Sequence, residues 1–199
     1  MSSNRDSRST DDGAIGVGPR LLMGEHVYLR RMERTDLPHV YRWLSDAELC
    51  GLIGHSGVSS VDEVEAWFER VSTDPTRRWY AVVTSDGDRV IGEAGLLRLN
   101  DGWRTTDMSI IIGERDDWRR GFGTEVGRIL LDFAFNYCGV HRVAIGVVGF
   151  HEPALRFWEK LGFSREGVQR DGYLHGGEFH DFVMMSILEG EWREQQARR

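Results

Sequence analysis

Along the first half of the chain, the spacing of apolar residues alternates between the period of a strand and that of a helix. Residues 26–32 form a strand-like run, and Thr35 is a suitable N-cap for a helix that extends to about residue 45. Ser60 and Glu63 have capping-box spacing, which predicts a second helix through about residue 71. The segment between them, CGLIGHSG, contains three glycines and predicts a loop.

The second half consists of apolar segments separated by turn residues. A helical stripe over residues 121–137 predicts the main helix, and the continuous apolar run 143–148 predicts a strand covered on both faces. Pro153 opens a short helix. The turns DGD (86–88) and HGGE (175–178) each predict a hairpin. The other expected strands are 79–84, 89–97, 105–112, 164–173 and 179–188.

The order of these elements is β-α-α-β-β-β-α-β-α-β-β. It predicts an α/β protein with a mixed, mostly antiparallel sheet and helices on both faces. A single domain over residues 20–192 accounts for the pattern. Residues 1–19 are polar and without periodicity, so they are expected to form a flexible tail, and residues 193–199 a C-terminal one.

Composition adds several exclusions. A hydrophobic fraction of 40%, with seven Trp and nine Phe, is typical of a globular domain. No apolar run approaches the length of a membrane span and MSSNRDSRSTDD is unlike a signal peptide, so a cytoplasmic protein without a membrane partner is expected. Cys50 and Cys138 indicate neither a disulfide framework nor a metal site. The net charge of −7 argues against a nucleic-acid partner and favours a cationic substrate.

The segment IIIGERDDWRRGFG, residues 110–123, carries the clearest chemical signal. Gly121 and Gly123 flank Phe122 where a helix should begin, which offers free main-chain N–H groups to an anion. Arg119 and Arg120 could add charge-assisted contacts to phosphate. The turn lacks the lysine of a Walker loop before Thr124 and the third glycine of a Rossmann fingerprint. A flexible helix start is the alternative interpretation.

Beyond this turn, the chain resembles the GCN5-related N-acetyltransferase (GNAT) family. Residues 118–123 match its Q/R-x-x-G-x-G/A turn, with Trp118 as a departure at the first place. VVGFHEPALRFWEKLGFSREG resembles the second signature, and GYLHGGEFHDFVMMSILEGEW resembles the final hairpin of enzymes that acetylate ribosomal-protein N-termini or polyamines. With HVYLRRMERTDL at the front, the resemblance covers residues 20 to 192.

The resemblance implies a GNAT fold whose fourth and fifth strands splay apart. It implies transfer of an acetyl group from acetyl-CoA to a primary amine, such as a protein N-terminus, a polyamine or an amino sugar, by direct attack and without a metal. It implies that the pantetheine arm pairs with the fourth strand, and it leaves a homodimer open. The residues expected at the cofactor are Ile110, Ile111, Ile112, Arg119, Arg120, Gly121, Phe122, Gly123, Thr124, His151 and Trp158.

Two carboxylates are candidates for the general base. Asp107 is the first choice, because similar enzymes often place a carboxylate at that position of the fourth strand. Glu93, within the apolar strand IGEAGL, is the second. A salt bridge between Asp107 and Arg98 or Arg104 is the structural alternative, and a water chain could replace a single base.

The general acid is the point where the sequence departs from the family. Trp158 stands where members commonly carry a tyrosine that protonates the leaving thiolate, and indole is not a usable acid. His151 replaces the asparagine at the start of the same helix. It could act as the acid, cap the helix or contact the cofactor. Tyr173 or water are further proton sources.

The acceptor amine is expected between the segment 45–60 and the final hairpin. Asp46, Glu48, Tyr173 and Asp181 are the expected contacts, with Glu178 nearby. His55, His175 and His180 lie in the same segments and suggest exposed histidines rather than a metal site. Three alternatives to an acetyltransferase stay open. They are an acyl-CoA-binding module with little or no turnover, an acyltransferase that uses a longer acyl-CoA, and an unrelated protein that binds a nucleotide or sulfate at the Gly121 turn.

Overall fold

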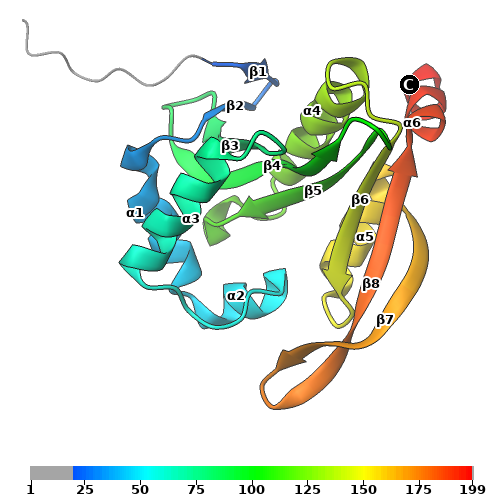
Figure 1. Cartoon of the computed structure of the whole chain (residues 1–199). Coiled ribbons are helices and arrows are strands. Elements are labelled where there is room, and N and C mark those ends of the chain that lie inside the picture. Colours follow the sequence, from blue (N-terminus) through cyan, green and yellow to red (C-terminus); the bar gives the residue numbers. More distant parts are fainter. Residues whose placement is uncertain (1–19, 199) are drawn as a thin grey trace, which may run out of the picture.

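A single eight-stranded sheet organises the protein. The computed structural model describes residues 20–198, so the expected tail over residues 1–19 lies outside the described residues (Figure 1). The strands follow the order β1-β2-β3-β4-β5-β6-β8-β7. They are β1 (Leu22–Met23), β2 (Val27–Arg31), β3 (Arg78–Thr84), β4 (Val90–Asn100), β5 (Thr105–Ile112), β6 (Arg142–Val148), β7 (Ser164–His175) and β8 (Glu178–Leu188).

Within residues 20–198, six α-helices and two short 3-10 turns accompany these strands. They are η1 (Arg34–Asp36), α1 (Leu37–Leu44), α2 (Ala47–Ile53), α3 (Val61–Thr73), η2 (Arg115–Asp117), α4 (Phe122–Asn136), α5 (Glu152–Leu161) and α6 (Glu189–Ala197). The expected order is therefore confirmed, with β1, α2 and α6 as additions. None of the helices in residues 20–198 is long and apolar enough to cross a membrane.

Helix α3 shows how local sequence fixes a boundary. The Ser60 hydroxyl accepts a hydrogen bond from the Glu63 N–H at 3.2 Å, and the Glu63 carboxylate accepts one from the Ser60 N–H at 2.7 Å. This reciprocal pair satisfies two N–H groups that the first turn leaves without a partner. The predicted capping box is confirmed.

The first half of the loop expected at CGLIGHSG, residues 50–53, instead belongs to the helix α2 (Ala47–Ile53), whereas residues 54–57 are not helical. Asp46 caps this helix, because its carboxylate accepts hydrogen bonds from the N–H groups of Glu48 and Leu49 at 3.0 and 3.1 Å. Gly54 ends the helix in the left-handed region at φ 72°. At the other end of the chain, residues 193–197 belong to α6 rather than to a tail.

All neighbouring strands pair antiparallel except β5 and β6. That parallel pair is short, since only the stretch from Thr105 to Asp107 pairs with Arg142 to Ala144. Beyond it the two strands diverge, and β6 continues beside β8 towards the projecting β7–β8 hairpin (Figure 1). The splay implied by the family resemblance is therefore confirmed. It leaves part of the β5 edge without a neighbouring strand.

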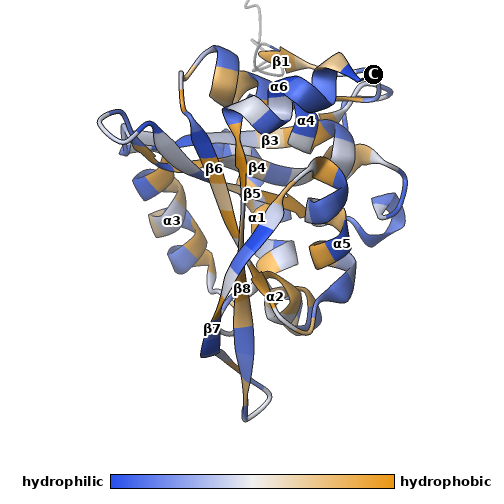
Figure 2. Ribbon diagram, turned by 90° about the vertical axis from the view of Figure 1, so that its right-hand side faces the viewer, coloured by the Kyte–Doolittle hydropathy of each residue, from blue (hydrophilic) through white to orange (hydrophobic). Residues whose placement is uncertain are grey.

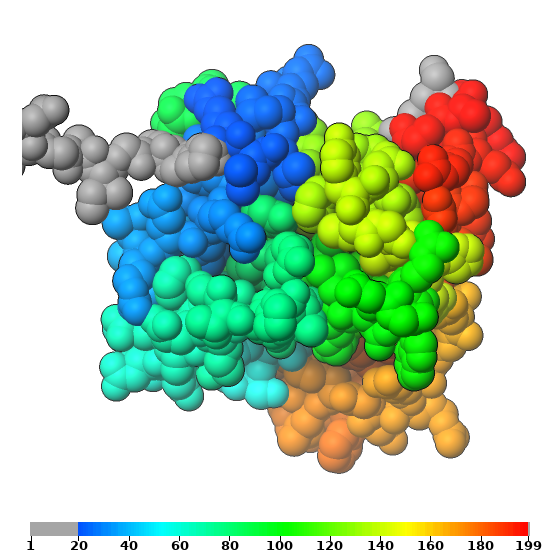
Figure 3. Space-filling view, turned by 45° about the horizontal axis from the view of Figure 1, so that its top comes forward, coloured from blue at the N-terminus to red at the C-terminus, as the bar shows by residue number. Residues whose placement is uncertain are grey.

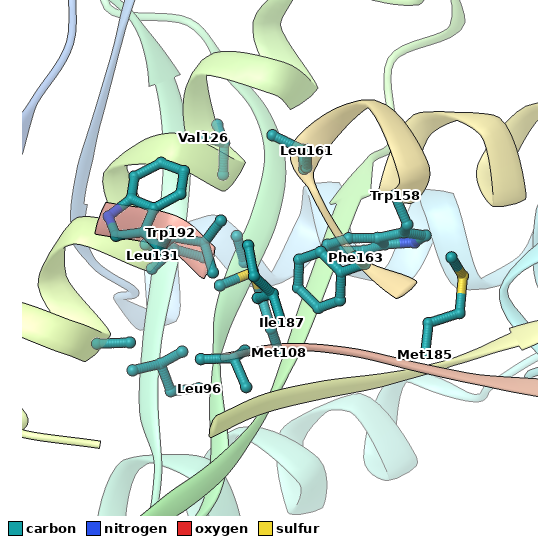
Figure 4. Packing of buried hydrophobic residues seen from close by; sticks show 14 of the residues in the cluster. Leu96, Met108, Val126, Leu131, Trp158, Leu161, Phe163, Met185, Ile187 and Trp192 are labelled. Atoms are coloured by element: carbon teal, nitrogen blue, oxygen red, sulfur yellow. The ribbon is translucent and has the colours of Figure 1, made fainter. Parts of the chain in front are cut away.

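Hydrophobic clusters cover both faces of the sheet. The cluster on one face includes Val126 and Leu131 of α4, Leu161 of α5 and Trp192 of α6, packed against Leu96 and other sheet residues (Figure 4). On the other face, the helices α1 and α3 pack against Trp79 and its neighbours. Figure 2 shows α3 on one side of the strands and α5 on the other. Fully burying each large side chain contributes about 1.5–3 kcal/mol.

Candidate active site

The unpaired edge of β5 begins where its pairing with β6 ends. Residues 108–112 continue β5 beside β4, and no residue of β6 pairs with them. Ile110 and Ile112 pack against the cluster of α4 and α5, whereas Ile111 lines a cavity on the α3 side. The side chains along the free edge thus alternate between the two faces of the sheet. The main-chain groups of this edge can pair with an extended ligand.

A turn rich in free N–H groups, residues 119–124, lies beside this edge; we call it the cradle. Arg119 and Gly121 adopt the left-handed region at φ 60° and φ 91°. The first main-chain bond of α4 runs from the Glu125 N–H to the Gly121 carbonyl at 3.1 Å. The N–H groups of Phe122, Gly123 and Thr124 therefore have no acceptor four residues earlier in the helix. Together with the positive end of the helix dipole they suit an anion such as a phosphate.

A buried carboxylate that the sequence reading missed holds the cradle in place. The Asp117 side chain is 2% exposed, and it accepts a bond from Arg120 at 2.8 Å and from Arg89 at 3.2 Å. Arg120 also lies over the Phe122 ring, at 4.9 Å from its centroid. In the described residues Arg119 makes no side-chain hydrogen bond or ion pair. Arg120 is therefore part of the scaffold, and Arg119 has its charge available for a ligand.

Trp118 links the cradle to the free edge. Its indole Nε1–H donates to the Ile112 carbonyl at 2.7 Å. A Cβ added to Gly123 would lie 3.5 Å from the Phe157 ring and 3.8 Å from Ile112, so these side chains border the cradle. The departure at the first place of the family turn therefore has a structural role.

Trp158, expected at the cofactor, lies in the hydrophobic core instead. Its side chain packs edge-on against Phe157 and Phe163, with ring centroids 4.8 and 5.0 Å away, and it is 5% exposed (Figure 4). The residue that borders the cradle is its neighbour Phe157. Adjacent side chains of the helix α5 point to different faces of that helix, and the sequence motif alone does not show which of them faces the cradle.

His151 begins α5 but does not cap it with its side chain. Its Nδ1 lies 3.1 Å from the Leu52 carbonyl, so Nδ1 carries the proton and donates. Burial lowers the pKa of His151, although the bond to Leu52 acts in the opposite direction. A neutral imidazole whose proton is already engaged is a poor acid for a thiolate.

Glu93 and Asp107 occupy different environments. Glu93 is 4% exposed and accepts a hydrogen bond from the Trp79 indole at 3.3 Å. Burial raises the pKa of Glu93 to about 7, and the bond from Trp79 only partly offsets this effect. Asp107 lies in the short paired part of β5 and accepts a bond from Arg98 Nε at 2.6 Å. This is the salt bridge that the sequence left open as its structural role.

Glu93 is one wall of a cavity of about 540 Å³, which we call the α3 cavity. It opens between α3, the segment after α2 and the sheet, and Ile111 of the free β5 edge also lines it. The Trp67 and Trp79 rings meet edge to face there, with centroids 5.9 Å apart. The remaining lining residues are Leu44, Ile53, Gly54, His55, Ser56, Val58, Ser59, Glu63, Val64, Ala66 and Arg70.

The acidic residues expected at the substrate are engaged elsewhere. Arg115, which the sequence reading missed, pairs with Asp46 at 2.7 Å and with Glu48 at 2.9 Å. This guanidinium, together with the N–H groups of α2, lowers the pKa of Asp46. Asp181 accepts a hydrogen bond from the Asp171 N–H at 3.1 Å within the hairpin. None of these three carboxylates lines the α3 cavity.

The hairpin side chains gather around Phe150. Tyr173 stacks on His175 with centroids 5.8 Å apart, and Phe150 lies edge-on to His180 at 4.7 Å. The Tyr173 hydroxyl reaches the His55 carbonyl at 3.4 Å, whereas the His55 ring lies 3.0 Å from Ser59. The cluster joins two of the three expected histidines. Among residues 20–198 no group of three His, Cys, Asp or Glu side chains could hold a metal ion.

Phe182 was missed by the sequence reading as well. A Cβ on Gly146 would lie 2.2 Å from this ring, and one on Gly54 would lie 3.3 Å from it. Gly146 therefore lets the Phe182 ring lie flat on β6, next to the end of α2. The signal in the sequence was a glycine inside an otherwise apolar strand.

A second groove lies along α4, on the opposite face of the sheet from the α3 cavity. It measures about 610 Å³ and follows the later turns of α4, between β1 and α6. Figure 3 shows these elements next to one another on one face of the molecule. Its lining includes Arg128, Phe133 and Tyr137, but not the cradle or Glu93.

A splayed sheet with a free strand edge, beside a helix start rich in free N–H groups, is the arrangement that the family resemblance implies for an acyl-CoA-dependent transferase. The family described as "Acetyltransferase (GNAT) domain" matches residues 26–164. The chain belongs to this family of acetyltransferases.

Known relatives are distant but match over most of their length. The N-acetyltransferase p20 of Bacillus licheniformis is 24% identical over 86% of this chain and 97% of its own. The spermidine N(1)-acetyltransferase of Escherichia coli K12 is 24% identical over 83% of this chain and 88% of its own.

Solved structures agree on the fold. A spermidine N-acetyltransferase from Vibrio cholerae, in complex with CoA and spermine, superposes with a TM-score of 0.78 at 24% identity. The match covers 84% of this chain and 98% of the other. A GNAT-family acetyltransferase from Bacillus anthracis gives a TM-score of 0.74 at 21% identity, over 85% and 98% of the two chains. Likeness at this identity establishes the GNAT fold and leaves the acceptor undetermined.

Proposed function

We propose that this acetyltransferase transfers the acetyl group of acetyl-CoA to a primary amine by direct attack, with Glu93 as the general base. The observation that carries the proposal is the position of Glu93. It is a buried carboxyl with a pKa of about 7, on the wall of the α3 cavity together with Ile111 of the free β5 edge. A base with this pKa is largely ionised just above neutral pH and can still accept a proton.

Three features of the chain would hold acetyl-CoA. The N–H groups of Phe122, Gly123 and Thr124 would receive the pyrophosphate, and the exposed Arg119 would add a charged contact. The main chain of residues 108–112 would pair with the pantetheine arm, since β6 leaves this edge open. Phe157 would border the arm near Gly123. The thioester would then reach the α3 cavity near Ile111.

Glu93 would take the proton that the amine nitrogen loses as it bonds to the thioester carbon. The carbon–sulfur bond breaks, and the thiolate takes a proton from water. Neither Trp158 nor His151 is suited to supply this proton, because Trp158 is in the core and the His151 proton is bonded to Leu52. Holding both reactants in one site supplies much of the acceleration.

The distant relatives support the use of acetyl-CoA and an amine, since a spermidine N-acetyltransferase with this fold is known in complex with CoA and spermine. A homodimer, a cytoplasmic location and the use of a longer acyl-CoA stay predictions. Because neither Trp158 nor His151 is suited to be the acid, an acyl-CoA-binding protein with little turnover is the second candidate.

The test replaces Glu93 by Gln and Asp107 by Asn, and follows CoA release from acetyl-CoA with a panel of primary amines. We expect Glu93→Gln to lower kcat by about a hundredfold and to remove the inflection near pH 7, while acetyl-CoA affinity is kept. Asp107→Asn is the matched control and should keep the wild-type pH profile, because Asp107 pairs with Arg98. The opposite pattern would make Asp107 the base. Tight acetyl-CoA binding by the wild type without release for any amine would favour the second candidate.

A further inference from the structure

The ionisable side chains that line the α3 cavity differ in their hydrogen-bond partners. The Glu63 carboxylate is held by the Ser60 N–H at 2.7 Å, and the His55 ring lies 3.0 Å from the Ser59 hydroxyl. Glu93 is buried beneath Trp79. Arg70 is the exception, since its guanidinium makes no hydrogen bond or ion pair within residues 20–198. At its solvent-exposed end the cavity therefore presents a guanidinium without a hydrogen-bond partner in the described residues.

Arg70 lies on the cavity face of α3. Glu63, Trp67 and Arg70 follow one another at helical spacing, over about 10 Å of the helix. Trp67 lies between the two charges and meets Trp79, which in turn bonds Glu93. A route lined by two indole rings thus connects the guanidinium of Arg70 with the carboxyl of Glu93.

The acids that favoured a polycationic substrate do not counter this charge. Asp46 and Glu48 are both paired with Arg115, and Asp181 bonds main chain in the hairpin. Besides Glu93, the carboxylate that lines the cavity is Glu63, which is already bonded to the Ser60 N–H at the start of α3. A second ammonium group on the acceptor would be repelled by Arg70.

On this basis we propose that the acceptor is an amine with a carboxylate at its other end, which Arg70 binds while the amine lies at Glu93. The inference rests on the proposed function, because it takes the α3 cavity as the acceptor site. A guanidinium binds a carboxylate with two parallel hydrogen bonds, and a methylene chain between the two ends packs on Trp67 and Trp79. Arg70 is then the residue that selects amino acids and similar amines over polyamines.

The test uses acceptors that differ only in the charge at the far end. γ-Aminobutyrate, n-butylamine and putrescine form one series, and ε-aminohexanoate, n-hexylamine and hexamethylenediamine form a longer one that allows for reach. CoA release is measured at low ionic strength, where surface charge is least screened. We expect kcat/KM to be at least about tenfold higher for the amino acid than for the diamine in one series or both.

Three variants separate a local role of Arg70 from net charge. Arg70→Glu should reverse the order within the series, and Arg70→Gln should make the three acceptors similar. Arg128→Glu makes the same change of charge on an exposed residue of the α4 groove, on the opposite face of the sheet, and should leave the order unchanged. Titration with acetyl-CoA checks that every variant is folded and binds the cofactor.

Each result decides between the two proposals. If the wild type prefers the diamines, or if Arg70→Glu and Arg128→Glu act alike, Arg70 does not select the acceptor although the enzyme is an amine acetyltransferase. If the wild type binds acetyl-CoA but acetylates none of the six amines, and none of the wider amine panel either, the proposed function fails and this inference with it. If it acetylates other amines of that panel but none of these six, only the inference is overturned.

Discussion

The cradle and the α3 cavity are built in opposite ways. The cradle comes from one continuous segment, in which residues 119–124 supply the N–H groups and Asp117 supplies the support. The α3 cavity takes its walls from α1, α3, the segment after α2 and three strands. A site made from main-chain groups of one turn is encoded locally, whereas a site made from distant side chains depends on packing. The two regions should therefore respond differently to substitution.

The largest effect is expected in the cradle. Gly121→Glu places a side chain and a negative charge at the start of α4, and we expect it to weaken acetyl-CoA binding about a hundredfold, about 3 kcal/mol. The matched control is Gly139→Glu, because Gly139 also has a positive φ and open space around it, at the other end of α4. Calorimetric titration of both folded variants measures the difference. Equal affinities would show that the cradle does not hold the cofactor.

The second prediction concerns the buried carboxyl of the cavity. The pKa of Glu93 is raised to about 7 in the folded state, above its ordinary value of 4.5. The carboxyl therefore keeps its proton on folding, and its contribution to stability is complete below about pH 4.5 and is lost as the pH rises to about 7. We expect a loss of about 3 kcal/mol over this range.

Urea unfolding at about pH 5 and about pH 8 measures this effect, as the difference between the wild type and Glu93→Gln. The difference isolates Glu93, because surface carboxylates whose pKa is lowered, such as Glu166, act in the opposite direction in both proteins. A wild-type protein that lost no more stability than Glu93→Gln between these pH values would contradict the buried, protonated state.

A smaller effect is expected from the support of the cradle. Asp117→Asn removes the charge that Arg89 and Arg120 share, and both guanidinium groups are exposed enough to return to water. We expect a loss of about 1–3 kcal/mol in the free energy of unfolding, with acetyl-CoA affinity reduced only severalfold. Asp116→Asn, at the exposed neighbouring position, is the control for the change of charge. Loss of affinity as large as in Gly121→Glu would mean that Asp117 shapes the turn itself.

Much of the fold could be predicted from the sequence, because its signals are local. The Ser60–Glu63 capping box and the helix start at Gly121 lie where they were expected. The missed helix α2 shows the limit of this reasoning. Three glycines predicted a loop, and Asp46 was expected at the substrate rather than as a helix cap. The packing of the end of α2 against β6 and Phe182 is a long-range contact that overrides local propensity.

The candidate site was predictable in one half only. The structure places the expected helix start at Gly121, with the N–H groups of Phe122 to Thr124 free of helical partners, and their role in binding an anion stays a prediction. The sequence favoured Asp107 over Glu93 as the general base. The register of β5 instead places Asp107 beside Arg98, in the short stretch where β5 still pairs with β6. Asp46 and Glu48 were expected at the substrate because their partner, Arg115, comes from another part of the chain.

The sequence alone determined the order of elements, the GNAT resemblance and the glycine turn at the start of α4, because periodicity, caps and glycines act over a few residues. Only the tertiary structure decided which carboxyl is buried, which acids are already paired and that Arg70 lacks a partner in the described residues. These properties depend on desolvation and on charges brought together by folding, and both vary with distance in space rather than with spacing along the chain.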